Sequence, residues 1–328
     1  MTPILAGSLL ATTLLIGCAH SDGSEKRVTV YVSADEHIAR EIFTAFTKQT
    51  GIYVDWVGDT ESSKNTMLVQ RLIRERNRPI ADVFWSSEIL GTIQLANDGV
   101  LTPCETQLTA QWPEQYRDKK MRWFGFSPRA RVIAYDPHRI SQESLPQYWW
   151  EYTQAVIADP RFGTTRTHVA VMAEFPEECE RLFASMEQRP MLGGNAATVQ
   201  AVVDGRALFA MTDSDDVHGA IARGHSIEMY MPRHHDGKGG GTLLIPNTVS
   251  IVKGCDHPEF AATFVDFLLS DEVATMLANS PSHNIPIQLS VASQFPNLVV
   301  EDPLKVDFYS VAEQDDAQIT QVMDAFSQ

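Results

Sequence analysis

The chain has 328 residues, of which 44% are hydrophobic and 21% charged, as is typical of globular proteins. Its 26 basic and 42 acidic residues give a formal net charge of −16. This balance argues against nucleic acid or anionic lipid as a partner, because phosphate contacts need clustered Lys and Arg. The length exceeds that of one ordinary hydrophobic core and predicts two lobes.

The N-terminal segment predicts export followed by lipid attachment. Residues 3–16 form an uncharged, mostly apolar run that is too short to span a bilayer, which takes about 20 apolar residues. Its end, Leu15–Cys18, resembles the lipobox of bacterial lipoproteins, in which the cysteine is lipidated and becomes the mature N-terminus. We therefore predict a signal peptide over residues 1–17, lipidation at Cys18 and a flexible tether over residues 18–26. The protein would lie in the periplasm or at the cell surface, anchored to a bacterial membrane.

The three other cysteines, Cys104, Cys179 and Cys255, stand in no Cys-x-x-Cys or Cys/His metal spacing. Export permits a disulfide, but an odd number leaves at least one thiol unpaired. We expect structural thiols, and the sequence does not say whether two of them pair.

The first third of the chain alternates strands and helices. Strands are expected at residues 27–33, 52–57 and 81–85, because β-branched and aromatic residues cluster there. Between them, apolar residues recur at helical spacing, and Gly51 and Gly99 follow two of these helical runs. This order predicts βαβ units and an α/β fold with parallel sheets.

Each of these strands is followed by a polar cluster. The candidate ligand-binding residues in these clusters are Ser33, Glu61, Ser63, Ser86, Ser87 and Glu88. In α/β sheets, ligands collect at the carboxyl ends of strands, where helix N-termini also offer free N–H groups. The alternative is that these residues only cap the helices that follow.

The middle of the chain repeats this pattern. Strands are expected at residues 131–135, 155–158 and 207–211, extended chain at 242–252, and a helical segment at 258–279. Thr164, Thr165 and Asn195 stand at helix starts and could donate hydrogen bonds to ligand oxygens. Trp85 and Tyr230 end strands and could stack on a sugar, although core packing is the alternative.

Asp213, Asp215 and Asp216 form the sharpest local signal. Three carboxylates in four residues repel one another unless a cation, hydrogen-bond donors or water offset them. They could bind an ammonium group, a hard metal ion or the hydroxyls of a polyol, and Asp213 ends a predicted strand. Alternatively, they cap the next helix and favour its dipole. His234, His235 and Asp236 precede a glycine-rich stretch, and we expect an exposed mobile segment there rather than a metal site.

An ordered set of segments resembles the bacterial ABC-transporter solute-binding proteins of the two-lobed type II class, near their ferric-iron-binding branch. The matching segments are Val30–Ser33, Phe46–Gly51, Ala81–Phe84, Gly99–Pro103, Arg129–Tyr135, Ile245–Lys253 and His257–Ser270. The resemblance implies two α/β lobes joined by two crossing strands, at residues 131–135 and 242–252. Lobe one would comprise residues 27–130 and 250–328, and lobe two residues 131–249. A ligand would bind in the cleft between them and be trapped by closure.

The resemblance also suggests residue roles. Iron-binding relatives use two adjacent tyrosines of lobe two, helped by a His and a Glu of lobe one. Here the corresponding stretch is Met211–Asp216, which has no tyrosine, whereas His37, Glu61 and Glu88 remain as lobe-one candidates. Arg129 matches an arginine that contacts an anion in relatives, although Pro128 replaces the usual glycine. It could bind a carboxylate or phosphate of the ligand, or bridge to a local acid.

The resemblance implies a monomeric binding protein without enzymatic activity that delivers its ligand to an ABC permease. No cofactor is expected, and a bound metal ion is not predicted. The ligand could be a metal ion, a sugar phosphate, a polyamine or an amino acid. A sensory lipoprotein with the same fold is the first alternative. The second is an exported hydrolase that uses Asp213 or Asp215 with Glu61 as acid and base, although no hydrolase motif supports it.

Overall fold

The computed structural model describes residues 25–58, 66–184, 191–313 and 320. The predicted signal peptide, the lipidation site Cys18 and the candidates Glu61 and Ser63 lie outside these residues. Within the described part of the chain, no helix has the length and apolar character needed to cross a bilayer.

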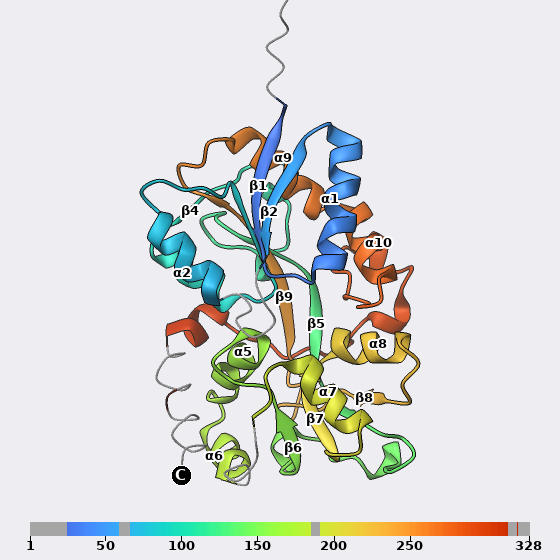
Figure 1. The fold of residues 1–328 in the computed structure, drawn as a ribbon. Coiled ribbons are helices and arrows are strands. Elements are labelled where there is room, and N and C mark those ends of the chain that lie inside the picture. The colour runs from blue at the N-terminus through green and yellow to red at the C-terminus, as the bar shows by residue number, and fades with distance from the viewer. Residues whose placement is uncertain (1–24, 59–65, 185–190, 314–319, 321–328) are drawn as a thin grey trace, which may run out of the picture.

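The upper lobe in Figure 1 is built on a parallel three-stranded unit. In this unit β1 (Arg27–Val32) lies between β2 (Tyr53–Gly58) and β3 (Val83–Ser86) and is parallel to both. β9 (Leu244–Val252) extends the sheet antiparallel to β3, and β4 (Leu101–Thr102) pairs with β9. The helices α1 (Glu36–Thr50), α2 (Thr66–Glu75) and α3 (Leu90–Asn97) connect these strands, as the alternating pattern predicts.

The lower lobe contains the second sheet. β6 (Ala155–Ile157) pairs parallel with β7 (Phe209–Asp213), and β7 pairs antiparallel with β5 (Phe124–Tyr135). β8 (Glu228–Tyr230) pairs with the other edge of β5. The helices of this lobe are α5 (Gly163–Met172), α6 (Pro176–Ala184), α7 (Asn195–Val203) and α8 (Ser214–Ala222).

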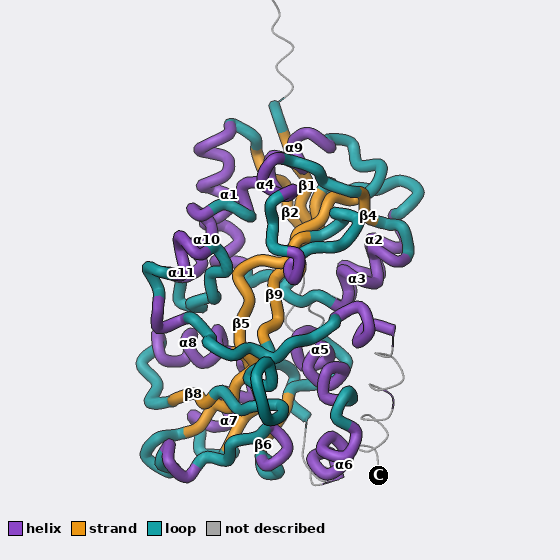
Figure 2. The backbone as a smooth tube through the Cα atoms, turned by 180° about the vertical axis from the view of Figure 1, so that it is seen from behind, coloured by secondary structure: helices purple, strands orange, loops and turns teal. Residues whose placement is uncertain are grey.

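Two strands, β5 and β9, run side by side from one lobe into the other, and both figures of the fold show them at the waist of the molecule (Figures 1 and 2). Their antiparallel pairing is interrupted between Phe126 and Arg129. Ser127, inside this interruption, has a φ of 39°, in the left-handed region. The side chain of Asn247 donates a hydrogen bond of 2.7 Å to the carbonyl oxygen of Ser127 and so holds the bulge in place.

Residues 258–279 are helical, as expected, but the segment is divided into two helices. The chain forms α9 (Pro258–Leu268) and α10 (Asp271–Asn279), and Ser270 separates them. The Ser270 side chain accepts a hydrogen bond from the backbone N–H of Val273, so this residue begins a new helix. The remaining short helices are α4 (Gln107–Ala110), α11 (Leu289–Ala292) and 3₁₀ turns at Glu114–Tyr116, Gln142–Ser144, Trp149–Glu151 and Pro296–Leu298.

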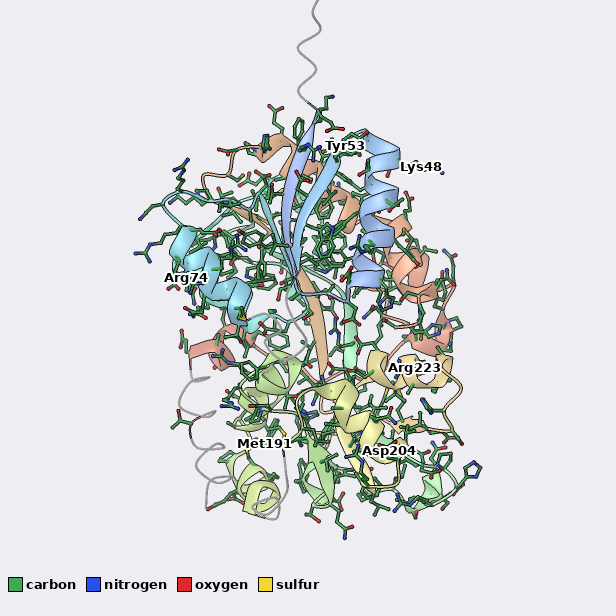
Figure 3. The ribbon with its side chains drawn as sticks, in the orientation of Figure 1. Lys48, Tyr53, Arg74, Met191, Asp204 and Arg223 are labelled. Atoms are coloured by element: carbon green, nitrogen blue, oxygen red, sulfur yellow. The ribbon has the colours of Figure 1, made fainter. Side chains whose placement is uncertain are left out.

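The buried faces of the helices follow from their sequence patterns. In α1, the apolar residues at helical spacing, Ile38, Ile42, Phe43 and Phe46, are buried against the sheet and α9. Lys48 at the end of α1 and Arg74 in α2 are exposed and lie on the outer side of the molecule (Figure 3). This packing fixes the N-terminus of α1 at the carboxyl end of β1, beside the gap between the lobes.

Candidate functional site

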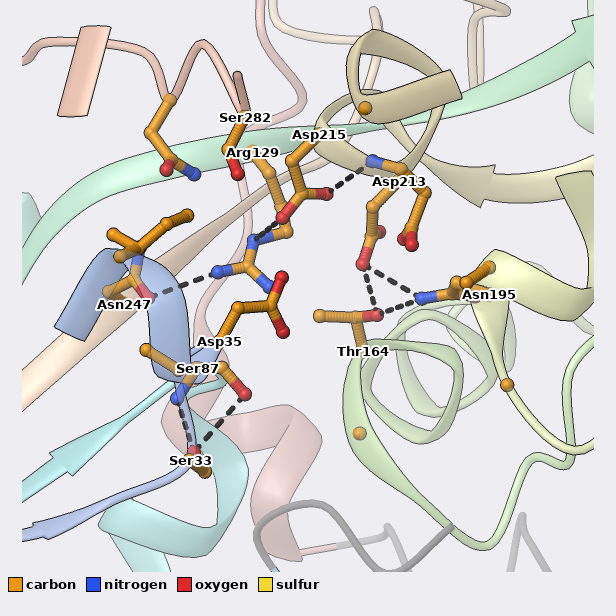
Figure 4. A pocket seen from close by; sticks show the side chains of 18 of the residues that line it. Ser33, Asp35, Ser87, Arg129, Thr164, Asn195, Asp213, Asp215, Asn247 and Ser282 are labelled. Atoms are coloured by element: carbon orange, nitrogen blue, oxygen red, sulfur yellow. Dashed lines mark hydrogen bonds and ion pairs between the residues drawn. The ribbon is translucent and has the colours of Figure 1, made fainter. Parts of the chain in front are cut away.

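A cavity of about 350 Å³ lies between the two lobes. It is bordered by the carboxyl ends of β1, β3 and β7, by the N-termini of α1, α5, α7 and α8, and by the segment after α10. Figure 4 shows its lining from close by. The volume is within the range of ordinary small-molecule sites, which is about 300–1,000 Å³.

The structure brings nine of the sequence candidates to this cavity. They are Ser33, Ser87, Arg129, Thr164, Thr165, Asn195, Asp213, Asp215 and Asp216. Ser33 and Ser87 meet across β1 and β3, since the Ser87 N–H donates to Ser33 Oγ at 2.8 Å. Sequence reasoning did not select several other polar residues that line the cavity, among them Asp35, Asn247 and Asn284. Asp35 and Asn247 stand within or beside segments that the sequence analysis quoted, whereas nothing in the sequence marked Asn284.

Asp213 points to the protein rather than to the open cavity. Its carboxylate accepts a hydrogen bond of 2.7 Å from the guanidinium of Arg131, and both side chains are buried. Thr164 Oγ1 and the Asn195 amide, at 2.9 Å, donate to the other carboxylate oxygen. Asp213 therefore orients Thr164 and Asn195 along the cavity wall, and Arg131 compensates its charge.

Arg129 is a buried cation at the cavity surface, and Arg223 of the loop after α8 also lines the cavity. Its Nε lies 3.4 Å from an Asp215 carboxylate oxygen, and its NH2 group donates to Asn247 at 3.0 Å. Burial works to lower the pKa of Arg129, but the carboxylates of Asp215, Asp213, Asp35 and Asp216 outweigh it, so that the pKa is raised. Of the two roles weighed for Arg129, the bridge to a local acid is present, and the side chain still lines the cavity.

Ser86 and Glu88 do not line the cavity, contrary to expectation. The Glu88 carboxylate accepts hydrogen bonds from the N–H groups of Leu90, at 2.6 Å, and Gly91, at 2.9 Å, and so caps α3. It also accepts a hydrogen bond of 3.0 Å from Thr167 in α5, across the gap between the lobes. Ser86 Oγ donates to the carbonyl oxygen of Glu88. Burial raises the pKa of Glu88. Both residues are therefore structural, in agreement with the capping alternative.

Tyr230 is a second correction. It lies in β8 and packs with Trp149 and Tyr152 in an apolar cluster of the lower lobe, away from the cavity. Trp85 does line the cavity, but it is almost fully buried, and the ring of Phe43 packs against it edge-on at 6.1 Å. Both residues therefore agree with the alternative of core packing rather than with stacking on a sugar.

The expectation of an exposed segment at residues 234–236 is wrong for His234, which is 1% exposed. Arg131 Nε donates to His168 Nδ1 at 3.2 Å, so the proton of the neutral His168 is on Nε2 and points at His234 Nε2, also at 3.2 Å. His234 Nδ1–H then donates to the carbonyl oxygen of Gly241 at 2.9 Å. Burial lowers the pKa of His168 well below its usual value and that of His234 to about 3. Both rings therefore stay neutral behind Arg131.

Three N–H groups on cavity-lining residues have no hydrogen-bond partner among the described residues. They are Trp85 Nε1, Arg129 Nε and Asn284 Nδ2. All three residues are at least nine-tenths buried. Buried donors normally have a partner, and leaving one without a partner costs about 1–3 kcal/mol. A ligand that brings acceptor atoms to this wall could supply these N–H groups with partners.

Two helix N-termini of the lower lobe add further donors. The N-cap positions of α5 and α7 are Phe162 and Gly194, and neither supplies a side-chain cap. Gly163 and Asn195, the first residues of these helices, line the cavity. Free N–H groups at such ends, together with the helix dipole, favour oxygen atoms that carry negative charge.

Among the described residues, His37 and the three cysteines do not form a metal or redox centre at the cavity. His37 is exposed on α1 at the edge of the cavity, and the described cavity lining includes no tyrosine. Cys104, Cys179 and Cys255 are free thiols, so the question of a disulfide among them is answered.

With this geometry in place, comparison with known proteins gives consistent results. The profile of the family described as bacterial extracellular solute-binding protein matches residues 181–319. Iron uptake protein A1 of Synechocystis sp. is 25% identical over 307 residues, which cover 84% of this chain and 81% of that protein. Iron-bound HitA from Pseudomonas aeruginosa superposes with a TM-score of 0.78 at 22% identity, covering 90% of this chain and 99% of HitA. AfuA from Actinobacillus pleuropneumoniae, with bound fructose-6-phosphate, gives a TM-score of 0.77 at 18% identity, covering 93% and 99%.

The structure has the two-lobed α/β fold of the type II periplasmic binding proteins. The chain is similar to the bacterial extracellular solute-binding proteins, and the relatives it matches include proteins named for ferric-iron binding.

Proposed function

We propose that this protein captures a small, polyhydroxylated organic solute with an acidic group, such as a hexose phosphate, and delivers it to an ABC importer. The relatives named above are binding and uptake proteins, which supports transport rather than catalysis. The ion pair between Asp213 and Arg131 argues against the hydrolase alternative, because Asp213 is already committed as a counter-ion.

One observation carries the choice of an organic ligand. Trp85, Arg129 and Asn284 line the cavity with buried N–H groups that lack a hydrogen-bond partner among the described residues. A bare cation cannot accept a hydrogen bond, whereas the hydroxyl and phosphate oxygens of a sugar phosphate can.

The other groups of the cavity match the same ligand. The carboxylates of Asp35, Asp215 and Asp216 can accept hydrogen bonds from sugar hydroxyls, and the N-termini of α5 and α7 favour a phosphate. The family resemblance implies that a site for ferric iron contains paired tyrosine ligands, and the described cavity lining has no tyrosine. AfuA with its bound fructose-6-phosphate is an example of such a ligand on the same fold.

The proposed function implies a cellular location for the protein and a closing motion of its lobes. A further relative, the Fe(3+)-binding periplasmic protein of Serratia marcescens, is 23% identical over 311 residues, and its name supports a periplasmic location. We propose a lipid anchor at Cys18 after removal of residues 1–17. Residues 27–130 with 250–328 and residues 131–249 would form the two lobes that close over the solute about β5 and β9.

A binding screen tests the proposal. Hexose phosphates, free hexoses, inorganic phosphate and ferric citrate are each titrated into the protein by calorimetry and by thermal shift. We expect a hexose phosphate to bind, and at 100 times its Kd to stabilise the protein by about 2.7 kcal/mol. Binding of ferric citrate with no response to any organic ligand would contradict the proposal.

Two variants test whether the ligand binds in this cavity. Asn284→Ala removes one of the unpartnered donors and should weaken binding at least tenfold. Asn279→Ala is the matched control, because Asn279 is exposed at the end of α10 and its amide donates to Thr275 within the same helix. Equal effects of the two substitutions would place the ligand elsewhere.

A further inference from the structure

An acidic cluster in this cavity is already compensated by cations of the chain itself. Asp213, Asp215 and Asp216 each offer a carboxylate oxygen, and these oxygens lie within 4.8 Å of one another. Three negative charges at such distances repel unless positive charge lies close by. Arg131 supplies it at Asp213, and Arg129 supplies it at Asp215.

The two arginines differ in their exposure to the cavity. Arg131 is fully buried behind Asp213 and also donates to His168, so it belongs to the wall. Arg129 lines the cavity itself, and Figure 4 shows its guanidinium between Asp35, Asn247 and Asp215. Its Nε has no hydrogen-bond partner among the described residues, although it lies 3.4 Å from Asp215. The guanidinium therefore lies beside the carboxylates that a bound cation would have to contact.

We propose that Arg129 determines the specificity of this site by excluding metal ions: its fixed positive charge occupies the acidic cluster that would otherwise hold a hard cation. The inference rests on the proposed function, because it explains how an acidic cavity on a fold shared with iron-binding proteins admits an organic ligand. A metal ion would have to displace Arg129 or bind beside it against charge repulsion. Removing that charge leaves clustered carboxylate oxygens, which are the ligands that hard cations prefer.

Four proteins and one metal probe test this assignment. Tb³⁺ is a hard trivalent cation whose emission can be excited through a nearby tryptophan, and Trp85 lines the cavity. It is titrated, as the metal alone, into the wild type, Arg129→Gln, Arg129→Lys and the double variant Arg129→Gln with Asp215→Asn. We expect Arg129→Gln to bind Tb³⁺ at least tenfold more tightly than the wild type. Arg129→Lys should resemble the wild type because it keeps the charge, and the double variant should lose the gain.

Structural damage alone would not produce this pattern, since it gives no new metal affinity and no rescue by lysine. If Arg129→Gln does not fold, Arg129→Met is the second neutral variant and carries the same expectation. Tb³⁺ binding to the wild type that disappears in Asp216→Asn would overturn the proposal, as would a folded neutral variant without increased affinity. If the wild type binds a hexose phosphate and the neutral Arg129 variant gains no affinity for Tb³⁺, only this inference is refuted. A wild type that binds metal and no organic ligand refutes the proposed function as well.

Discussion

Asp213 at the end of β7 and Arg131 in β5 are direct neighbours in the antiparallel pairing of these strands, and their side chains form an ion pair at 2.7 Å. The exposed fractions of the two side chains are 2% and 0%. A pair this deeply buried depends on both partners, because either charge alone would be left without compensation.

Asp213→Ala should therefore reduce the free energy of unfolding by about 3–5 kcal/mol, since it leaves the buried Arg131 uncompensated. Urea denaturation measures the loss. Asp204→Ala is the control, because Asp204 pairs with Arg206 in the solvent and should change little. Adding Arg131→Met to Asp213→Ala should restore part of the stability. If Asp213→Ala unfolds like the wild type and only ligand binding is lost, the aspartate contacts the ligand.

The neutral histidines behind Arg131 predict a pH dependence of stability. Both His168 and His234 have folded pKa values below the unfolded value of about 6.5, so only the unfolded chain takes up their protons as the pH falls. The stability that the two neutral histidines contribute to the folded state is complete above pH 6.5. As the pH falls toward the folded pKa, the free energy of unfolding decreases by about 1.4 kcal/mol per pH unit for each histidine. Denaturant titrations at pH 7.5, 6.0 and 5.0 measure this slope.

His234→Gln should flatten that slope by the share of one histidine, even though it lowers stability at pH 7.5. His138→Gln, at an exposed position, should leave the slope as it is in the wild type. A slope that is identical in all three proteins would show that His234 is protonated in the folded state.

The hydrogen bond between Thr167 and Glu88 predicts an effect on closure. It joins α5 to the start of α3 across the gap, and Thr167→Val removes it with little change of shape. A typical hydrogen bond contributes about 0.5–1.5 kcal/mol, so ligand affinity should fall by up to about tenfold. Calorimetry measures the affinity, and small-angle scattering should report a larger ligand-free particle. Thr275→Val is the control, since Thr275 donates only within α10. Unchanged affinity in Thr167→Val would mean that this contact persists in the open form.

The backbone of Ser127 predicts a stabilising substitution. Its φ of 39° is unfavourable for a residue with a Cβ, and glycine adopts such angles freely. Ser127→Gly should raise the free energy of unfolding by up to about 1 kcal/mol, as measured by thermal denaturation. Ser250→Gly, within β9, should instead lower it, because glycine weakens a regular strand. A loss of stability in Ser127→Gly would mean that its side chain contributes more than its backbone costs.

Most of the architecture could be predicted from the sequence, because alternating strands and helices have local patterns. The position of Asp213 at a strand end followed from the apolar run before it. The pairing of Asp213 could not be predicted, since Arg131 is separated from it by 82 residues along the chain. An arginine within an otherwise apolar strand was the available signal, because such a residue needs a buried partner.

The errors at Glu88 and His234 have a similar origin. A Ser-Ser-Glu cluster after a strand has the same composition whether it caps a helix or contacts a ligand, and only the direction of the Glu88 side chain decides. Adjacent histidines before glycines suggest an exposed loop, but the ring of His234 is directed inward by its bond to Gly241. Asn284 gave no signal because its role depends on how the segment after α10 folds back to the cavity.

The three free cysteines have a consequence for how this protein matures. Burial raises the pKa of Cys104 and of Cys179 to about 12, and that of Cys255 to about 11, so hardly any thiolate is present at neutral pH. A fold in which the described cysteines remain thiols needs no oxidising enzyme to form. Reductants added during purification should leave its melting temperature untouched.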